Sequence, residues 1–442
     1  MNSTWNAAQV AEAAGGKLIA GIADADGPSS IVVDSRQAGP GTLFVGLRGE
    51  QADGGAFAGD ALENGAWGVI VDKEHADSLA ASARGVVIEA IDPLNALASL
   101  AQQWRRELGC AVIAITGSTG KTSTKDIVAG MLAPSRRTVA TFENFNTEIG
   151  LPLTILGAPA GTEVLVLEMA MRGSGQIAEL TRIAEPDVGV ITNVGPVHLE
   201  LLGSVEAIAA AKSELIAGLA ADSVAILPAG EPLLDPHIRS DLRTVRFGPG
   251  GELSELPRGL ELPFASAHMR TNALAALAAV RALGVEPDGR IEVELSKLRG
   301  QRLLLEGGVV VINDCYNANP MSMRAALDDL AESASGRSVA VLGDMRELGP
   351  DERRFHAELG AHVRSLDIDV LVTVGELTRS AGPTFGGENL YALSDAAQAS
   401  AEIASIVKPG DTVLIKGSRG VGLEVVAEAL CETLPTAAGG DS

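Results

Sequence analysis

A short glycine-rich stretch constrains the fold of this chain more than any other feature. Residues 112–131 pass from an apolar run of strand type, through Gly117 and Gly120, into a helical pattern that begins near Lys121. Glycines let the backbone curl so that its N–H groups point inward, and the helix adds its positive dipole end. Lys121 contributes a full charge, and the Thr122 hydroxyl is of the type that binds Mg²⁺ beside nucleotides. The stretch therefore predicts a loop for the phosphates of a nucleoside triphosphate.

This loop is shorter than the complete Walker pattern, which has a further glycine five residues before Gly120, where the chain has Ile115. An ordinary strand, turn and helix with a chance lysine is therefore the alternative interpretation. If the loop binds ATP, we expect contacts from the whole turn. That turn comprises Thr116, Gly117, Ser118, Thr119, Gly120, Lys121, Thr122 and Ser123.

Composition limits the kinds of partner. The 442 residues carry a net charge of −23 without a cluster of Lys or Arg, which argues against binding to nucleic acid or to an anionic membrane surface. Three cysteines without a CxxC pair suggest neither a disulfide framework nor a zinc ribbon. No apolar run reaches membrane-spanning length. We therefore expect a soluble, cytoplasmic protein without membrane insertion, and a monomer, because no long apolar surface helix is evident.

The alternation of apolar runs and helical patterns predicts an α/β protein of three domains, because the chain is too long for a single core. Residues 1–92 are typical of a small α/β domain, and residues 93–305 of a central P-loop domain with a mainly parallel sheet. Residues 306–442 predict a doubly wound, Rossmann-like domain. Gly307 and Gly308 resemble a hinge between the last two domains.

Two loops of the first domain carry polar groups at the ends of apolar runs. Ser35 and Arg36 follow one run, and a loop over residues 49–55, with Gly49 and Asp53, follows another. An arginine together with free backbone donors at strand ends is typical of a site for an anionic or nucleotide-like ligand. Plain surface turns are an equally good interpretation of both loops.

Two apolar runs of the central domain lead to metal-ligand types of residue. Residues 164–167 end in Glu168, and residues 188–191 lead to a loop that holds His198. Because the carboxyl ends of parallel strands meet at one edge of a sheet, both side chains should lie beside Thr122. A carboxylate and an imidazole at that place predict magnesium ligands. A structural, hydrogen-bonded role is the alternative for a lone histidine.

Several other polar residues stand out in the apolar central domain. Lys212 lies among alanines in a helical segment, where its ammonium either reaches water or is chemically special. Asn144 and Asn146 belong to a polar loop that suggests a ligand contact, with a self-capped turn as the alternative. Asn272 opens a long Ala/Leu helix, where a helix-cap role alone could explain it. Arg302 closes the domain.

Four apolar runs of the last domain each end in a loop rich in ligand-type residues. Because these loops follow parallel strands, they should gather at one edge of the sheet and form a ligand crevice. Any single loop could be ordinary turn chemistry, but four at one edge favour a binding site. The candidate residues are Asp314, Asn317, Asn319, Lys416, Ser418 and Arg419.

The run DCYNANPMSM, residues 314–323, resembles that of the Mur ligase family member that adds D-alanyl-D-alanine. The resemblance to this family extends over nearly the whole chain. The DNPR- or DDPR-type motif of the sibling that adds a diamino acid does not occur in the sequence. The other segments that carry the resemblance are TGSTGKTSTKD, NFNTEIGLP, LEMAMRG, TNVGPVHLELLGSVEAIAAAKSEL, HMRTNALAA, LGDMRELG and IKGSRG.

The resemblance implies an ATP-dependent ligase of peptidoglycan precursor synthesis. In the family mechanism, ATP phosphorylates a carboxylate of UDP-N-acetylmuramoyl-tripeptide, the amine of D-alanyl-D-alanine attacks the acyl phosphate, and ADP and phosphate leave. By position, Lys121 matches the phosphate-loop lysine, while Thr122 and Glu168 match ligands of one Mg²⁺. His198 matches a ligand of a second Mg²⁺, and Lys212 matches a lysine that is carbamylated in several relatives.

The same matching assigns roles around the nucleotide and the amine. Asn272 resembles an adenine contact, and Arg302 and Asp314 resemble residues that reach the nucleotide when the C-terminal domain closes. The residues expected to face the incoming amine or the acyl phosphate are Asn317, Asn319, Lys416, Ser418 and Arg419.

For the first domain, the resemblance implies that Ser35, Arg36 and the loop over residues 49–54 hold the UDP-sugar. This loop departs from the family pattern in one respect. Relatives often read DGH, whereas here Gly55 stands in place of the histidine. The departure puts the details of the UDP-sugar contact in doubt.

Two other functions stay open at this point. Another ligase of the same superfamily would add a different amino acid or a glutamate tail, and the amine that drives ADP release would distinguish it. A P-loop protein that uses ATP only as a conformational switch would turn over ATP without a UDP-peptide and an amine. The ligand loops of the third domain disfavour the switch.

Overall fold

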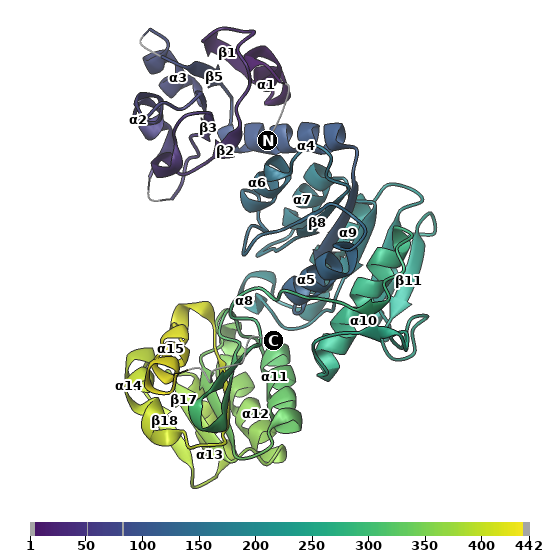
Figure 1. Cartoon of the computed structure of the whole chain (residues 1–442), viewed down its shortest axis with the longest axis vertical. Coiled ribbons are helices and arrows are strands. Elements are labelled where there is room, and N and C mark those ends of the chain that lie inside the picture. Colours follow the sequence, from purple (N-terminus) through teal and green to yellow (C-terminus); the bar gives the residue numbers. More distant parts are fainter. Residues whose placement is uncertain (1–4, 51, 82–83, 436–442) are drawn as a thin grey trace.

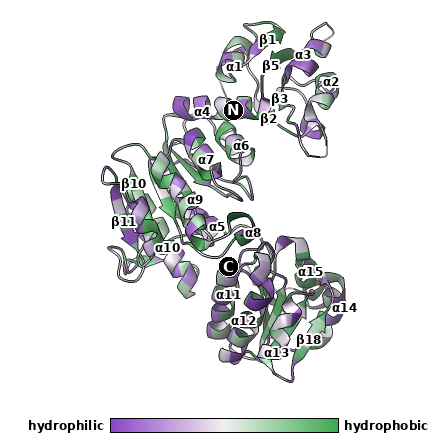
Figure 2. Cartoon of the chain, turned by 180° about the vertical axis from the view of Figure 1, so that it is seen from behind, coloured by the Kyte–Doolittle hydropathy of each residue, from purple (hydrophilic) through white to green (hydrophobic). Residues whose placement is uncertain are grey.

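The computed structural model describes residues 5–50, 52–81 and 84–435, so Gln51 of the loop over residues 49–55 lies outside the described part. Three main β-sheets follow one another along the long axis of the molecule, each with its own helices (Figure 1). The strands are mostly hydrophobic, and the helices around them mix hydrophobic and hydrophilic residues (Figure 2). This arrangement confirms the predicted α/β class with three domains. Within the described ranges, no helix is both long and apolar enough to cross a membrane.

The first sheet is small and mostly parallel, because short apolar runs alternate with turns and short helices. Its strands and helices are α1 (Ala7–Ala13), β1 (Lys17–Ala20), β2 (Ser30–Val32), β3 (Thr42–Val45), α2 (Ala58–Glu63), β4 (Gly68–Val71), α3 (Lys73–Leu79), β5 (Val86–Glu89) and α4 (Pro93–Leu108). The strand order is β1-β5-β4-β3-β2, and only β1 runs antiparallel to its neighbour. Helices α2 and α3 cover one face, and α1 and α4 cover the other.

The central sheet is parallel throughout, with the order β11-β10-β9-β6-β8-β7. Its strands are β6 (Ala111–Thr116), β7 (Thr138–Ala140), β8 (Val164–Glu168), β9 (Val188–Ile191), β10 (Val224–Pro228) and β11 (Arg243–Phe247). A two-stranded pair, β12 (Leu260–Glu261) and β13 (Gly289–Arg290), stands apart. The helices are α5 (Lys121–Leu132), α6 (Gly150–Gly157), α7 (Gln176–Ala184), α8 (Leu199–Leu202), α9 (Val205–Gly218) and α10 (Ala267–Ala282).

Strand β6 shows why this sheet lies at the centre of the domain. Successive side chains of a strand point to opposite faces, so a strand buried on both faces is apolar throughout. Val112 and Ala114 belong to the core beneath α6, α7 and α9, whereas Ile113 and Ile115 belong to the core beneath α5 and α10. The apolar run that the sequence shows is therefore a strand sandwiched between two layers of helices.

Helix α4 joins the first two sheets into one continuous core. Trp104 of α4 packs edge-on against Trp5, with ring centroids 5.7 Å apart, and its indole N–H donates to Ala158 O at 3.0 Å. The same cluster of buried residues contains Leu43 of the first sheet and Leu165 of the central sheet. The N-terminal and central domains are thus packed together without a polar gap.

The third sheet has the order β14-β15-β19-β16-β17-β18 and separate cores on its two faces. Its strands are β14 (Gln301–Leu305), β15 (Val309–Asn313), β16 (Ser338–Gly343), β17 (Val370–Val374), β18 (Leu390–Leu393) and β19 (Thr412–Lys416). All pairs are parallel except β14 with β15. Its helices are α11 (Pro320–Ser333), α12 (Glu352–Ser365), α13 (Gly382–Phe385), α14 (Ala396–Ile406) and α15 (Glu424–Thr433).

The glycine pair before the third domain has a different role from the hinge that the sequence suggests. Gly307 and Gly308 have φ of +74° and +73° and form the turn between β14 and β15, which pair antiparallel. Residues 301–305 therefore belong to the third sheet, although they precede residue 306. A glycine pair suits such a turn because positive φ costs glycine little.

Candidate active site

The predicted phosphate loop connects the end of β6 to the start of α5. Gly117 has φ +149°, and Gly120, at the N-cap of α5, has φ +76°. Both angles favour glycine. A Cβ at Gly117 would lie 1.8 Å from Thr192 Oγ1, and a Cβ at Gly120 would lie 2.4 Å from Asn272 Oδ1. Backbone conformation and lack of space therefore both require the two glycines.

The loop after β9 holds the phosphate loop in shape. Thr119 N donates to Asn193 Oδ1 at 2.9 Å, and the Asn193 amide donates to Thr119 Oγ1 at 2.7 Å. Ser118 Oγ donates to Gly195 O at 3.1 Å. A loop that is fixed in this way at a helix N-terminus is a preorganised cradle for an anion. No local signal distinguishes Asn193 in the sequence, because its partner Thr119 lies in a different segment.

Lys121 lies over this loop. Its Nζ donates to Gly117 O at 2.8 Å. Burial lowers the pKa of Lys121 below its ordinary value, the charge of Glu168 raises it, and the charge of Arg299 lowers it. Arg299 was not among the sequence candidates; its guanidinium stacks 4.0 Å from the centre of the Tyr316 ring. The cationic groups of Lys121 and Arg299 and the carboxylate of Glu168 therefore lie near the loop, and the excess of positive charge suits a polyphosphate.

Six buried side-chain oxygen atoms of the described residues have no hydrogen-bond partner, and we consider the two that lie where the loop and the end of β8 meet. They are Thr122 Oγ1 and Glu168 Oε2, on side chains that are 3% and 1% exposed. The other carboxylate oxygen, Oε1, accepts from Asn146 Nδ2 at 2.8 Å. Buried oxygens are normally satisfied, so an unpaired pair of this kind needs an explanation. A hydroxyl and a carboxylate are ligands that Mg²⁺ prefers, and they fit that ion.

His198 lies in the loop after β9, at the N-cap of α8, with φ +51°. Its Nδ1 is 2.5 Å from Oε2 of Glu347, which belongs to the loop after β16 in the third domain. Burial lowers the pKa of His198 below its ordinary value; Glu347 raises it, and the charges of Lys121 and Lys212 lower it. The imidazole therefore lies close enough to Lys121 and Lys212 for their positive charges to lower its pKa.

Lys212 is 2% exposed on α9, and within the described part of the chain its ammonium has no hydrogen bond or ion pair. Burial lowers the pKa of Lys212 well below its ordinary value, and the charge of Lys121 adds to the effect. Because only 2% of Lys212 is exposed, an ammonium extended freely into water does not describe this residue. A buried amine without a partner is costly unless its charge is removed or compensated.

These side chains come from separate parts of the sequence but share one edge of the central sheet. In the strand register, Ile115 of β6 lies opposite Glu168 of β8, and Thr116 lies opposite Ile191 of β9. Glu168 and the loop that carries His198 therefore follow their strands on the side where β6 leads into the phosphate loop. The structure thus brings Glu168 and His198 to the expected edge.

The asparagine candidates have different surroundings. Asn146 contacts Glu168 as described above, whereas Asn144 is exposed and its carbonyl accepts from Asn146 N at 2.7 Å. Asn272 is buried on α10 with its amide against Gly120, and the N-cap of α10 is Ser266. The helix-cap alternative for Asn272 is therefore wrong.

In the first domain, the candidate polar groups bind near neighbours in the sequence. Ser35 begins a 3₁₀ turn (Ser35–Gln37), and Arg36 is exposed with its Nη2 2.7 Å from Asp34 Oδ2. The Arg36 hydrogen bonds lower the pKa of Asp34 to about 2. Gly49 N donates to Ala52 O at 2.9 Å, and Asp53 caps a second 3₁₀ turn by accepting from Gly55 N at 3.0 Å.

An imidazole occupies the space beside Gly55, where relatives often carry a histidine. A Cβ at Gly55 would lie 2.5 Å from Nδ1 of His75, which comes from the first turn of α3. That Nδ1 is 2.8 Å from Asp72 Oδ1, and His75 Nε2 is 3.9 Å from Asp53 Oδ2. The sequence did not reveal His75, because it lies 20 residues after Gly55 and beyond β4. The loop therefore has an imidazole from another element.

We expect Gly55→His to destabilise the protein by about 1–3 kcal/mol, because the new side chain must share its space with His75. The double variant Gly55→His/His75→Ala should recover most of this loss. Chemical unfolding of the two variants and of His75→Ala alone measures the coupling. Equal losses in Gly55→His with and without His75 would show that the two positions do not compete.

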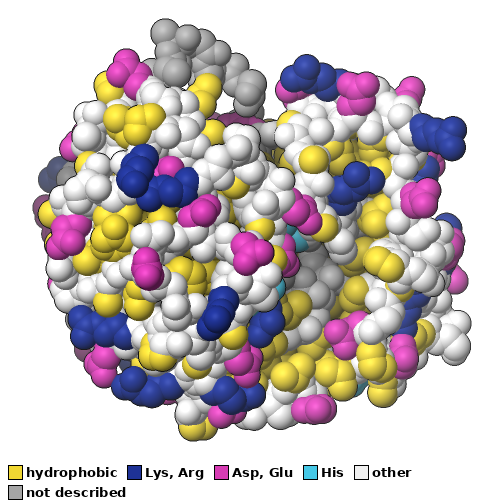
Figure 3. Space-filling view, turned by 90° about the horizontal axis from the view of Figure 1, so that it is seen from below, with side chains coloured by type: hydrophobic (Ala, Val, Ile, Leu, Met, Phe, Trp, Pro, Cys, Tyr) yellow, Lys and Arg dark blue, Asp and Glu magenta, His cyan; other side chains and the backbone are white. Residues whose placement is uncertain are grey.

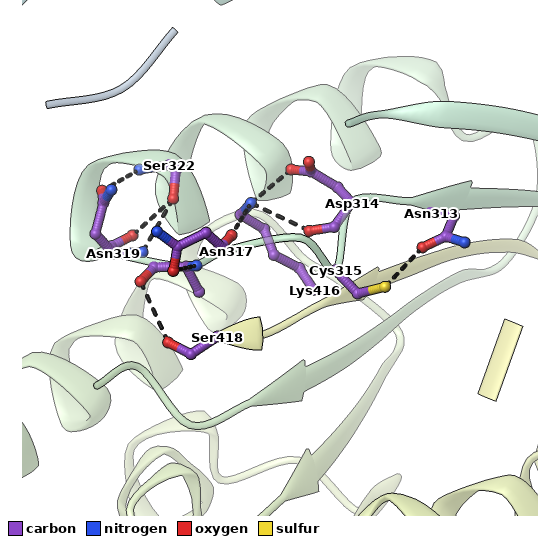
Figure 4. A network of polar contacts seen from close by, with 9 residues as sticks. Asn313, Asp314, Cys315, Asn317, Asn319, Ser322, Lys416 and Ser418 are labelled. Atoms are coloured by element: carbon purple, nitrogen blue, oxygen red, sulfur yellow. Dashed lines mark hydrogen bonds and ion pairs between the residues drawn. The ribbon is translucent and has the colours of Figure 1, made fainter. Parts of the chain in front are cut away.

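In the third domain, Lys416 connects two of the predicted ligand loops (Figure 4). Its side chain is 2% exposed, and its Nζ is 2.6 Å from Asp314 Oδ2 and donates to Asn317 O at 3.0 Å. A charge-assisted contact of this kind fixes both partners. The ammonium of Lys416 and the carboxylate of Asp314 therefore neutralise each other in this conformation.

The other candidate residues form hydrogen bonds or ion pairs within the third domain. Asn319 Oδ1 accepts from Ser322 N at 2.9 Å and caps α11, as Figure 4 shows. Ser418 Oγ accepts from Arg346 N at 3.0 Å. Arg419 lies 3.3 Å from Glu424. Arg302 Nη2 lies 2.7 Å from Asp329 Oδ2 of α11, so the structure does not bring Arg302 to the phosphate loop.

The surface seen from the end of the long axis carries Lys and Arg side chains dispersed among Asp and Glu (Figure 3). No basic patch gathers on that face. The dispersed charges agree with the strongly negative net charge of the chain. An anionic ligand would therefore be held by individual loops, because this face offers no extended region of positive electrostatic potential.

Comparison with known proteins identifies the family. The family model described as "Mur ligase family, catalytic domain" matches residues 29–105, "Mur ligase middle domain" matches residues 115–256, and "Mur ligase, glutamate ligase domain" matches residues 298–419. The chain belongs to the Mur ligase family. The resemblance seen in the sequence is therefore confirmed.

Similar proteins agree in their names. UDP-N-acetylmuramoyl-tripeptide–D-alanyl-D-alanine ligase of Bacillus subtilis is 36% identical over 429 residues, which cover 91% of this chain and 93% of that protein. The Escherichia coli protein of the same name is 30% identical over 431 residues, covering 91% and 94%. Among solved structures, MurF from Acinetobacter baumannii has a TM-score of 0.85 at 29% identity, covering 97% and 99%. MurF from Thermotoga maritima in complex with ADP has a TM-score of 0.80 at 30% identity, covering 91% and 97%.

Proposed function

We propose that this chain is the ATP-dependent ligase that joins D-alanyl-D-alanine to UDP-N-acetylmuramoyl-tripeptide in the cytoplasm, through an acyl phosphate. The names of its relatives support this activity. The observation that carries the proposal is the pair of unpaired buried oxygens, Thr122 Oγ1 and Glu168 Oε2, beside Lys121 and the phosphate loop. A triphosphate with its metal ion needs such groups at that place.

The central domain would bind and orient ATP. The loop from Thr116 to Ser123 and the N-terminus of α5 would hold the phosphates, and the Lys121 ammonium would stabilise negative charge on the transferring phosphoryl group. Asn272, which contacts Gly120, would lie beside the nucleotide. No side chain has to act as a nucleophile, because the substrate carboxylate attacks the phosphorus directly and the ADP oxygen leaves.

Two Mg²⁺ ions are part of the proposal. Thr122 and Glu168 would hold one ion, and His198 and Lys212 the other. Bound Mg²⁺ would supply positive charge to the phosphates and the acyl oxygen. Lys212 would serve as a ligand only after its neutral amine adds CO₂, which forms an N–C bond, releases a proton and leaves a carbamate. Burial of Lys212 without a partner supports this modification, since the carbamate replaces an uncompensated ammonium.

The flanking domains would supply the other substrates. Residues 1–92 would bind the UDP-sugar through Ser35, Arg36 and the loop with Gly49 and Asp53. Residues 93–305 would bind ATP, and residues 306–442 the dipeptide. We propose a monomer that needs neither nucleic acid nor membrane insertion. Arg302 and Asp314 would reach the nucleotide when the C-terminal domain closes. The residues that would contact the dipeptide or the acyl phosphate are Asn317, Asn319, Lys416, Ser418 and Arg419.

The test is ADP release from ATP by the purified chain. We expect release only when UDP-N-acetylmuramoyl-tripeptide and D-alanyl-D-alanine are both present, with Lys121→Ala as the inactive control. A series of other amines in place of the dipeptide distinguishes the remaining ligases of the superfamily. ATP turnover that needs neither co-substrate would instead indicate a conformational switch, and turnover with glutamate alone would indicate a glutamate ligase.

A further inference from the structure

The central and third domains meet at the loop that carries His198. A Cβ at Gly195 would lie 1.8 Å from Met321 Sδ of α11, and a Cβ at Gly349 would lie 3.6 Å from Glu200 Cα. The two domains therefore contact each other on both sides of His198, through the Met321 side chain near Gly195 and through backbone at Gly349. Contacts of this kind place the loop after β16, residues 344–350, directly against the metal-ligand edge of the central sheet.

Besides the stacking of Arg299 on Tyr316, a side-chain hydrogen bond between His198 and Glu347 joins the two domains in the described residues. His198 Nδ1 lies 2.5 Å from Glu347 Oε2, and the residues are 149 positions apart in the chain. Both have positive φ, +51° for His198 and +63° for Glu347. A left-handed conformation is uncommon for residues other than glycine and persists where the surroundings demand it. Both backbones are therefore held in the conformation that lets these side chains meet.

The contact occupies only one ring nitrogen. Within the described part of the chain, Nε2 of His198 has no hydrogen-bond partner, so its lone pair is available when Nδ1 carries the proton. A metal-binding histidine usually donates its other N–H to a carboxylate, which fixes the tautomer and the direction of the ring. The His198–Glu347 pair has this arrangement, with the carboxylate contributed by a different domain.

We propose that Glu347 is a positioning residue for metal binding: it orients His198 so that Nε2 faces a divalent cation, and the third domain thereby completes a metal site of the central domain. This inference rests on the magnesium site of the proposed function. It goes beyond that function by coupling the arrangement of the two domains to metal affinity. A domain contact that only holds the domains together would not change how tightly the ion binds.

The experiment titrates Mn²⁺ into the full-length protein with a non-hydrolysable ATP analogue, and free Mn²⁺ is measured by electron paramagnetic resonance. The site of interest is the one weakened in His198→Ala. One test variant is Glu347→Gln, which keeps the shape of the side chain but removes its charge. The other is Glu347→Asn, because asparagine tolerates the positive φ of this position well. Glu376→Gln is the matched control, because Glu376 is an exposed glutamate of the same domain that pairs with Arg353.

We expect Glu347→Asn to raise the Mn²⁺ dissociation constant at this site by about 10–100-fold, and Glu347→Gln to raise it less. Half-saturating Mg²⁺ in the ligase assay should rise in parallel, whereas KM for D-alanyl-D-alanine should stay within about twofold. The combined variant His198→Ala/Glu347→Asn should bind Mn²⁺ no more weakly than His198→Ala, because the carboxylate acts through the imidazole.

Mn²⁺ affinity within twofold of the unmodified protein in both Glu347 variants would overturn the proposal. If Glu347→Asn does not fold, the Mn²⁺ affinity of Glu347→Gln provides the test, since glutamine and glutamate have nearly the same side-chain volume. The proposed function fails separately, when the unmodified protein shows no ligase activity. In that event the Mn²⁺ titrations still decide the role of Glu347.

Discussion

Lys212→Ala is expected to lower ligase activity on the order of 10²–10³-fold, the loss typical of removing one group that stabilises charge at a reaction centre. Lys212 is nearly inaccessible on α9 and has no partner for its amine in the described part of the chain. If its carbamate is a metal ligand, the variant lacks one anionic ligand and retains a space of similar size. Steady-state ADP release in bicarbonate-buffered solution measures the loss.

A rescue experiment distinguishes the carbamate from a packing role. Acetate or propionate can enter the space left in Lys212→Ala and supply a carboxylate, so either acid should restore part of the activity. Lys212→Met fills the same space with an apolar side chain and should not respond. Normal activity of Lys212→Ala, or an equal lack of response to the acids in both variants, would remove the metal-ligand role.

Glu168→Gln should lower activity by a similar factor, on the order of 10²–10³-fold, and stabilise the metal-free protein by about 1–3 kcal/mol. The two effects have one cause. Glu168 is 1% exposed, and its Oε2 has no hydrogen-bond partner in the described residues. A buried carboxylate with an unsatisfied oxygen costs folding free energy that its attraction to Lys121 offsets only in part, and the neutral amide removes that cost together with a magnesium ligand.

Chemical unfolding in EDTA, with and without the substitution, measures the gain. Glu163→Gln is the matched control near the start of the same strand, because Glu163 already accepts from Arg137 N at 2.9 Å. That variant should gain no stability and keep its activity. A Glu168→Gln protein that is less stable in EDTA, or that retains activity within about tenfold, would contradict this account of the orphaned oxygen.

The sequence predicted the features that depend on local pattern. The phosphate loop, its glycines and the run ending in Glu168 follow from residue types and spacing, because strand, turn and helix signals act over a few residues. The common edge of Glu168 and the His198 loop follows from one topological rule of parallel sheets. The family resemblance then added roles that residue patterns alone do not provide.

Contacts between distant segments were beyond such reasoning. His75 occupies the space beside Gly55, and Asn272 occupies the space where a Cβ of residue 120 would lie. Glu347 contacts His198 from another domain. No local signal reveals these pairings, because each depends on how separate elements pack. The same limit explains Asn319, a ligand-type residue that caps a helix, and Arg302, whose partner is Asp329.

The continuous core around α4 bears on how this protein could be recombined with its relatives. Trp5, Trp104 and the residues packed with them belong to both of the first two domains, whereas the buried residues in the cores of the third sheet all lie at or after Leu305. A chimera that exchanges the C-terminal unit would leave every large apolar cluster whole. A chimera joined near residue 92 would divide the apolar core that the first two domains share. The C-terminal domain can therefore be exchanged between relatives more easily than the N-terminal domain.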